Sequence, residues 1–123
     1  MSILDDAKVH YDRATVTLNF DSGELAAACS LLEEALKAKP DDTLLLTCYC
    51  AALSDLGRFL DAERILMKAV QLGSKERNTF FNLGVACMNI NSRRNGAETW
   101  FKKAAQLSPD DQSWEAYIDF HAY

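Results

Sequence analysis

The side chains best suited to chemistry are two closely spaced cysteines, Cys48 and Cys50. A Cys-x-Cys pair can act as a redox couple or supply half of a metal site. The surrounding pattern predicts a helix, on which residues two apart point about 200° apart, so the two thiols cannot easily share one metal ion. No further Cys or His cluster stands at ligand spacing. We therefore interpret all four cysteines as reduced, buried structural residues: Cys29, Cys48, Cys50 and Cys87.

The remaining candidates for catalysis are two histidines and several pairs of adjacent acids. His10 and His121 have no Ser or Cys nucleophile in a recognisable motif nearby. Adjacent carboxylates point in different directions on a helix, and the pairs at residues 41–42 and 110–111 stand where new helices are expected to begin, which favours capping. The sequence contains no glycine-rich phosphate-binding motif. We therefore predict no catalytic residues, no metal site, no cofactor and no enzymatic activity.

Composition and charge narrow the class of protein. The chain has 123 residues, which suits one domain, and a net charge of −5. Nucleic acids and anionic membranes attract basic surfaces, so this charge favours neither as a partner. The sequence has no apolar run of about 18 residues, and residues 1–6 include two acids and no basic residue, unlike a signal peptide. We expect a cytoplasmic protein.

A repeat of about 34 residues organises the chain. Ala28, Ala62 and Ala97 occupy matching places, 34 and 35 residues apart. Around each of them, apolar residues follow the spacing of one helix face, and a second alanine recurs seven residues later. Small residues at fixed places let neighbouring helices approach closely. Pro40 and Pro109, which cannot continue a helix, end the first and third copies.

Each of these helices is preceded by another. The middle copy has one over about residues 42–56 and the third over about residues 75–90. Apolar or small residues recur at the same spacing in all three copies, and turn-forming residues stand between the two helices of each pair. The matching sets are Tyr11, Ala14, Thr15 and Leu18; Leu46, Tyr49, Cys50 and Leu53; and Phe80, Leu83, Gly84 and Cys87.

This two-helix unit resembles the tetratricopeptide repeat. The third copy matches that family's pattern best, with Phe80, Leu83, Gly84, Ala97, Phe101, Ala104 and Pro109. The resemblance implies an all-α fold, a right-handed α-solenoid of antiparallel helix pairs with about seven helices. It also implies a single domain over residues 1–123, with repeats over about residues 8–42, 43–76 and 77–111.

The residues after the third repeat are expected to form the last helix. Asp110 and Asp111 suit a helix N-terminus, and one helix face would carry Trp114, Tyr117, Ile118 and His121. A helix over about residues 112–123 would cap the exposed apolar side of the last repeat. The alternative is that these residues begin a fourth repeat that ends at Tyr123.

The resemblance also implies a concave groove, lined by the first helix of each pair, that holds a peptide. Asparagine amides in this lining could pair with a peptide backbone, and Phe81 and Met88 could hold an apolar anchor. A charge clamp for an acidic C-terminus is not expected, because Asp12 and Cys48 stand at two of the clamp positions. The register places these residues in the groove: Val9, Arg13, Val16, Thr47, Cys48, Ala51, Asn78, Phe81, Asn82, Val85 and Met88.

These features favour a non-catalytic protein-interaction module that binds a protein or peptide segment and acts as an adaptor or scaffold. One alternative is a small chaperone for a secreted or assembling subunit. Another is a structural domain that self-associates, as a homodimer held by its terminal helix faces. An enzyme has the least support, because no constellation of catalytic residues is found.

Overall fold

Six α-helices and one short 3-10 helix make up the computed structural model, which describes residues 2–16 and 22–117. These residues contain no strand, and none of their helices is both long and apolar enough to cross a bilayer. The all-α fold predicted from the sequence is confirmed for this part of the chain. The helices are α1 (Ile3–Val16), α2 (Ser22–Ala38), α3 (Thr43–Asp55), α4 (Phe59–Gln71), α5 (Arg77–Met88), η1 (Asn91–Gly96, 3-10) and α6 (Ala97–Ala105).

Local sequence signals set several of the helix ends. Asp42 caps α3, where its carboxylate accepts the amide of Leu45 at 3.1 Å. Glu76 caps α5 by accepting the amides of two residues in its first turn. Gly57 and Gly73 have φ of 83° and 93°, the left-handed conformation in which a chain can leave a helix and turn back.

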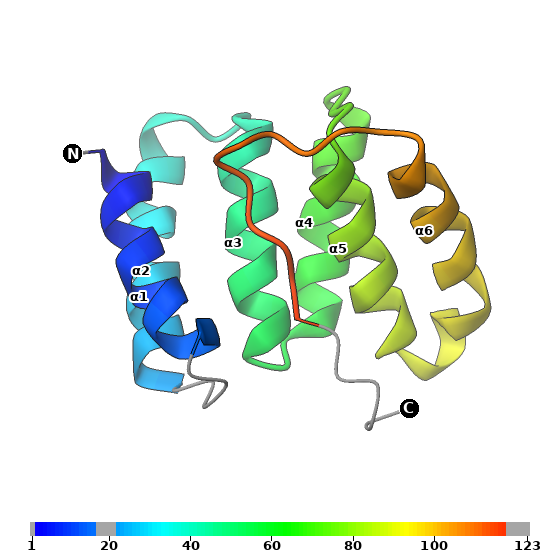
Figure 1. Cartoon of the computed structure of the whole chain (residues 1–123), viewed down its shortest axis with the longest axis horizontal. Coiled ribbons are helices and arrows are strands. Elements are labelled where there is room, and N and C mark those ends of the chain that lie inside the picture. Colours follow the sequence, from blue (N-terminus) through cyan, green and yellow to red (C-terminus); the bar gives the residue numbers. More distant parts are fainter. Residues whose placement is uncertain (1, 17–21, 118–123) are drawn as a thin grey trace.

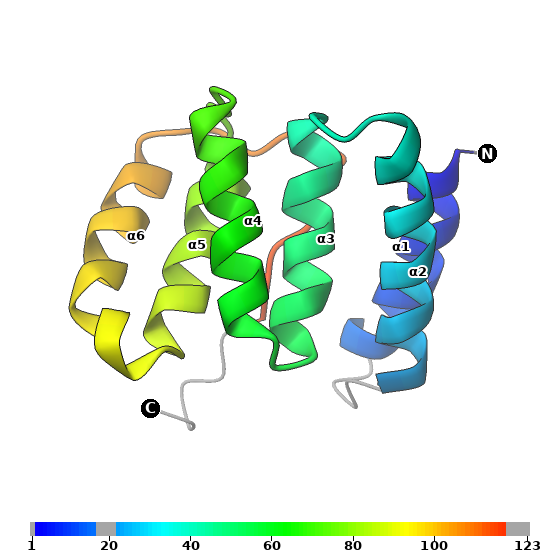
Figure 2. The same ribbon diagram turned by 180° about the vertical axis from the view of Figure 1, so that it is seen from behind.

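The helices stack as three pairs, each made of neighbours in the sequence. Helix α1 packs on α2, α3 on α4, and α5 on α6, while α2 contacts α3 and α4 contacts α5. Figure 1 shows one face of this stack, where α1, α3 and α5 lie near the end of the described chain. Figure 2 shows the opposite face, where α2 and α4 are in front.

The matched alanines of the repeat are buried on the second helix of each pair. Ala28 and Ala62 are fully buried, and Ala97 is 3% exposed. Fully buried leucines fill the space beside them, one or two on each central helix: Leu25, Leu32, Leu53, Leu66 and Leu83. This burial confirms the helix faces that the repeat register predicted.

The closest approach in the third pair is between Gly84 on α5 and Phe101 on α6. A Cβ atom added at Gly84 would lie 2.7 Å from Phe101 Cε1 and 2.8 Å from its Cδ1. The ring of Phe101 therefore occupies the space that a side chain at position 84 would take. The edge of this ring also packs against Phe81, with ring centroids 5.4 Å apart.

The predicted C-terminal helix is wrong for residues 112–117. These residues leave α6 through a turn and then run extended across the faces of α3 and α5 (orange to red in Figure 1). The expectation for residues 118–123 lies outside the described part of the chain. The described chain thus has six α-helices and a 3-10 helix rather than seven α-helices, since the seventh was this cap.

Two local features explain why no helix forms here. Asp110 was expected to cap a helix, but its side chain accepts the amide of Gln112 at 2.8 Å and its carbonyl accepts the amide of Ser113 at 3.0 Å, which closes a tight turn. Beyond this turn, side chains of α1, α3 and α5 bind the backbone groups that a helix would otherwise satisfy.

Candidate peptide-binding groove

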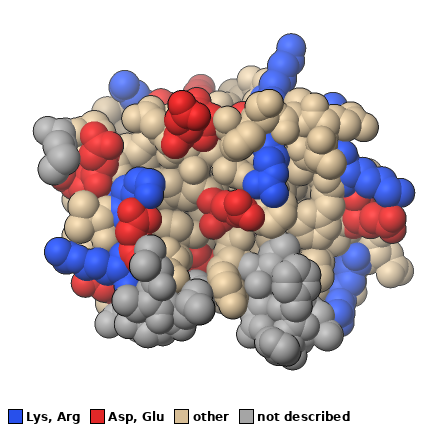
Figure 3. Space-filling view, viewed as in Figure 1, with Lys and Arg blue, Asp and Glu red and all other residues tan. Residues whose placement is uncertain are grey.

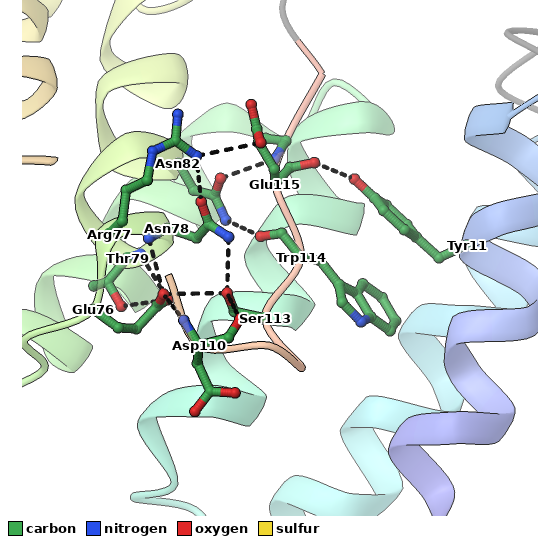
Figure 4. A network of polar contacts seen from close by, with 11 residues as sticks. Tyr11, Glu76, Arg77, Asn78, Thr79, Asn82, Asp110, Ser113, Trp114 and Glu115 are labelled. Carbon is green, nitrogen blue, oxygen red and sulfur yellow. Dashed lines mark hydrogen bonds and ion pairs between the residues drawn. The ribbon is translucent and has the colours of Figure 1, made fainter. Parts of the chain in front are cut away.

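Residues 110–117, called the tail below, lie in a groove formed by α1, α3 and α5. The burial of alternate side chains shows how deep the tail lies: Trp114 and Ala116 are each 2% exposed, whereas Tyr117 is 43% exposed. Alternation between buried and exposed residues is typical of an extended chain with one face on a surface. The groove therefore already holds one extended polypeptide, and Figure 4 shows its polar contacts.

Asn82, on α5, is the centre of these contacts. Its Nδ2 donates to the Trp114 carbonyl at 2.9 Å, and its Oδ1 accepts the Ala116 amide at 2.8 Å (Figure 4). A carboxamide can make both bonds because it carries a donor and an acceptor side by side. Asn82 is fully buried. Because both of these bonds go to backbone atoms, they do not depend on which side chains the tail carries.

The N-terminal end of α5 binds the beginning of the tail. Asn78 Nδ2 donates to Ser113 Oγ at 2.8 Å. Glu76, besides capping α5, accepts the Asp110 amide and Ser113 Oγ, each at 3.1 Å. One carboxylate therefore joins the start of the helix to the start of the tail.

Arg77 contacts Glu115, an exposed acid that stands between the buried tail residues Trp114 and Ala116. Its guanidinium lies 3.3 Å from Glu115 Oε2 and stacks over the Phe81 ring, 4.4 Å from the ring centroid. The stacking fixes the position of the guanidinium, since a cation is attracted to the face of an aromatic ring. Acidic and basic groups are interspersed with uncharged atoms on this side of the molecule (Figure 3).

Helices α1 and α3 bind the other edge of the tail. The Tyr11 hydroxyl, which has one proton to donate, lies 2.7 Å from the Glu115 carbonyl oxygen and 2.8 Å from Asp55 Oδ2. Asp55 Oδ1 accepts the Tyr117 amide at 3.0 Å. Burial raises the pKa of Asp55 to about 6, although the bonds from Tyr11 and Tyr117 act in the opposite direction.

The deepest contact is between aromatic rings. The Trp114 indole stacks on Tyr11 with ring centroids 4.5 Å apart and planes inclined by 17°. The indole N–H is buried and has no hydrogen-bond partner among the described residues. The place where Trp114 lies therefore binds the face of the ring, and the described residues there provide no acceptor for the indole N–H.

Comparison with known proteins adds one partial similarity. No protein-family model matches the chain. The chain is similar to protein O-mannosyl-transferase Tmtc1 of Drosophila melanogaster, with 32% identity over 104 residues. The match covers 80% of this chain but only 12% of that relative. The similarity thus covers most of the helical repeats, and the activity in the relative's name belongs to a much longer protein.

Three of the predicted groove residues contact the tail. They are Asn78, Asn82 and Cys48, whose thiol lies 3.5 Å from the Gln112 carbonyl. Each comes from a position that the repeat register placed on the first helix of a pair. These contacts come from α3 and α5.

The other predicted residues are not among those that hydrogen-bond to the tail, and their places differ. Thr47 is buried between helices, where its hydroxyl bonds to that of Thr79 at 2.7 Å. Phe81 packs on α6, and Met88 is half-buried, while Val9 and Arg13 are exposed. Ala51 and Val85 are buried in the same cluster as Trp114 and Ala116 of the tail. Val16 ends α1, and its side chain lies outside the described part.

Four residues that bind the tail were not predicted to do so: Tyr11, Asp55, Glu76 and Arg77. Tyr11 was assigned to the helix-packing face, and it serves both purposes, because its ring is buried while its hydroxyl reaches the tail. A signal was present in the sequence: Trp114, Glu115, Ala116 and Tyr117 alternate in the way that an extended segment does.

The cysteines are free and buried. Burial raises the pKa of Cys29 and of Cys87 to about 11, and it raises the pKa of Cys48 and of Cys50 well above the usual value, so all four are thiols at neutral pH. This agrees with their interpretation as structural residues. His10 Nδ1 pairs with Glu24 at 2.6 Å. Within residues 2–16 and 22–117, no three His, Cys, Asp or Glu side chains are grouped as metal ligands.

Proposed function

We propose that this chain is a tetratricopeptide-like interaction module that binds an extended peptide or protein segment in the groove of α1, α3 and α5. It acts as a non-catalytic adaptor or scaffold in the cytoplasm. One observation carries the proposal: an extended segment already lies in the groove, bound through its backbone by side chains of three helices. Backbone contacts of this kind suit many sequences, as peptide recognition requires.

The repeat architecture supports the same proposal. The matched alanines are buried, and Gly84 admits the Phe101 ring at the place where the tetratricopeptide pattern has a glycine and an aromatic residue. Stacked pairs of this type leave one side of the first helices uncovered, which provides an extended binding surface.

Peptide display on the full chain tests the proposal. The Trp114→Ala variant is the suitable target, because weakening the tail contact frees the groove for other segments. We expect selected peptides to bind this variant and to lose affinity by at least about tenfold when Asn82→Leu is added, since one or two buried polar contacts are lost. Lys102→Ala, an exposed change on α6, serves as the control and should leave binding unchanged. Selected peptides that bind equally well with Asn82→Leu would contradict the groove as the site.

A further inference from the structure

The tail shows what the groove requires of a side chain at three successive positions. At the first, Trp114 is 2% exposed and contacts the Tyr11 ring face to face. Its N–H has no partner among the described residues, so nothing here selects an indole over another flat ring. The first position therefore suits an aromatic residue, either tryptophan or phenylalanine.

The second and third positions have different requirements. Glu115 points outward to Arg77, and the guanidinium is kept in place by the Phe81 ring. Ala116 points inward and is 2% exposed within the same buried cluster as Trp114. An acid suits the second position because it lies next to the Arg77 guanidinium. A small residue suits the third position because the buried cluster leaves no room for a larger side chain.

We propose that the groove recognises an extended peptide with the pattern aromatic–acidic–small, bound where Trp114, Glu115 and Ala116 now lie. The chain's own triplet occupies the site until such a peptide displaces it. This inference rests on the proposed function, since it names the class of partner for the same groove.

The tail competes with any external peptide because it is tethered. A short linker holds it at an effective concentration on the order of millimolar, so an external peptide of the same sequence binds the unmodified chain weakly. The indole N–H of Trp114 lowers the affinity of the tail for the groove, because a buried donor without an acceptor weakens the tail contact. A peptide with phenylalanine at this position avoids that loss.

The test uses the full chain and a fluorescent octapeptide with the sequence of residues 110–117. Binding is measured by fluorescence anisotropy. We expect Trp114→Ala in the chain to tighten binding of this probe by at least about tenfold relative to the unmodified chain, as the tethered competitor is removed. Trp100→Ala is the matched control: this second tryptophan packs against Phe80, away from the tail, and its loss should leave probe binding as in the unmodified chain.

Changes within the probe test the pattern itself. Against the Trp114→Ala chain, the probe with Trp114→Phe should bind at least as tightly as the original, because no buried donor is left without an acceptor. The probe with Trp114→Ala should lose at least about tenfold in affinity. Glu115→Lys and Ala116→Leu in the probe should each weaken binding. Circular dichroism confirms that the chain variant is folded; if Trp114→Ala is not folded, Ala116→Glu in the chain releases the tail instead.

The possible results separate this inference from the proposed function. If the probe with Trp114→Ala binds as well as the original, the pattern is wrong, even when displayed peptides bind in a manner that depends on Asn82. If no peptide binds any folded variant, both proposals fail. A concentration-dependent dimer that Trp114→Ala abolishes would also overturn the inference, because the tail would then occupy the groove of a second copy.

Discussion

The phenol of Tyr11 and the indole of Trp114 stack at a centroid distance of 4.5 Å, although 103 positions separate the two residues. The contact joins the first helix directly to the tail. The Tyr11 hydroxyl strengthens this link, since its one proton lies between two acceptors, the Glu115 carbonyl of the tail and Asp55 on α3. The first helix, the third helix and the tail therefore share one buried polar centre.

Tyr11→Phe tests this centre, because it keeps the stacked ring and removes only the hydroxyl. The Glu115 carbonyl and Asp55 then lose the one donor that they share, so we expect the free energy of unfolding to fall by about 1–3 kcal/mol. Urea denaturation measures this. Tyr49→Phe is the matched control: its hydroxyl donates to Glu33 at an exposed site, and its loss should cost less than about 1 kcal/mol. Equal urea midpoints for Tyr11→Phe and the unmodified chain would show that the hydroxyl contributes nothing to stability.

Gly84→Ala tests the close approach of α5 and α6. The added Cβ would lie 2.7–2.8 Å from the Phe101 ring, so the ring must move away from Phe81. We expect a loss of about 1–3 kcal/mol, which lowers the melting temperature by several degrees. Gly96→Ala is the control, since a Cβ there has no atom within 4 Å, and its melting temperature should change little. Similar melting temperatures for both variants would show that the helices adjust without cost.

The repeat itself could be predicted from the sequence, for a physical reason. Helix packing requires small residues at fixed places, and three copies of the same requirement leave a visible period. Ala28, Ala62 and Ala97 are therefore found where the register put them, and the ends of α3 and α5 lie within two residues of the prediction. The groove positions Asn78 and Asn82 follow from the same register.

The tail could not be predicted in this way. Its conformation depends on hydrogen bonds from residues far away in the sequence, such as the bond between Tyr11 and the Glu115 carbonyl, 104 positions apart. The local pattern was ambiguous, because Trp114 and Tyr117 fit one face of a helix while Trp114 and Ala116 fit one face of an extended segment. Side-chain groups of the groove decide between the two by replacing the helical hydrogen bonds.

The raised pKa of Asp55 predicts how stability depends on pH. Burial raises this pKa from 3.8 to about 6, so between about pH 4 and pH 6 the folded chain keeps a proton that the unfolded chain has lost. The contribution of Asp55 to stability is fully present below about pH 4 and is lost as the pH rises through about 6. The slope is at most about 1.4 kcal/mol per pH unit.

Asp55→Asn removes this titration and keeps one oxygen that can accept the Tyr117 amide. Its NH2 group faces the Tyr11 hydroxyl oxygen and can donate to it, so the hydroxyl proton stays on the Glu115 carbonyl. Urea denaturation of the variant and of the unmodified chain should be compared from pH 4 to pH 7. The other carboxylates act equally in both chains, so the difference between the two unfolding free energies isolates Asp55. We expect this difference to change in favour of the variant as the pH rises to about 6 and then to level off. A difference that does not vary with pH would contradict a raised pKa.

Cys48 can report directly whether the tail occupies the groove. Its thiol is fully buried beneath the tail, 3.5 Å from the Gln112 carbonyl, whereas Cys50 on the same helix is fully buried on the side that faces α2 and α4, near Cys29 and Arg64. Pulsed alkylation followed by mass spectrometry should therefore show slow labelling of both thiols in the unmodified chain.

With Trp114→Ala, labelling of Cys48 should accelerate by at least about tenfold. The reason is that each 1.4 kcal/mol lost in the binding of the tail raises tenfold the fraction of molecules in which the tail has left the groove. Cys50 should stay protected; equal acceleration of both thiols would mean that the whole domain unfolds and that the tail is not a separately released element.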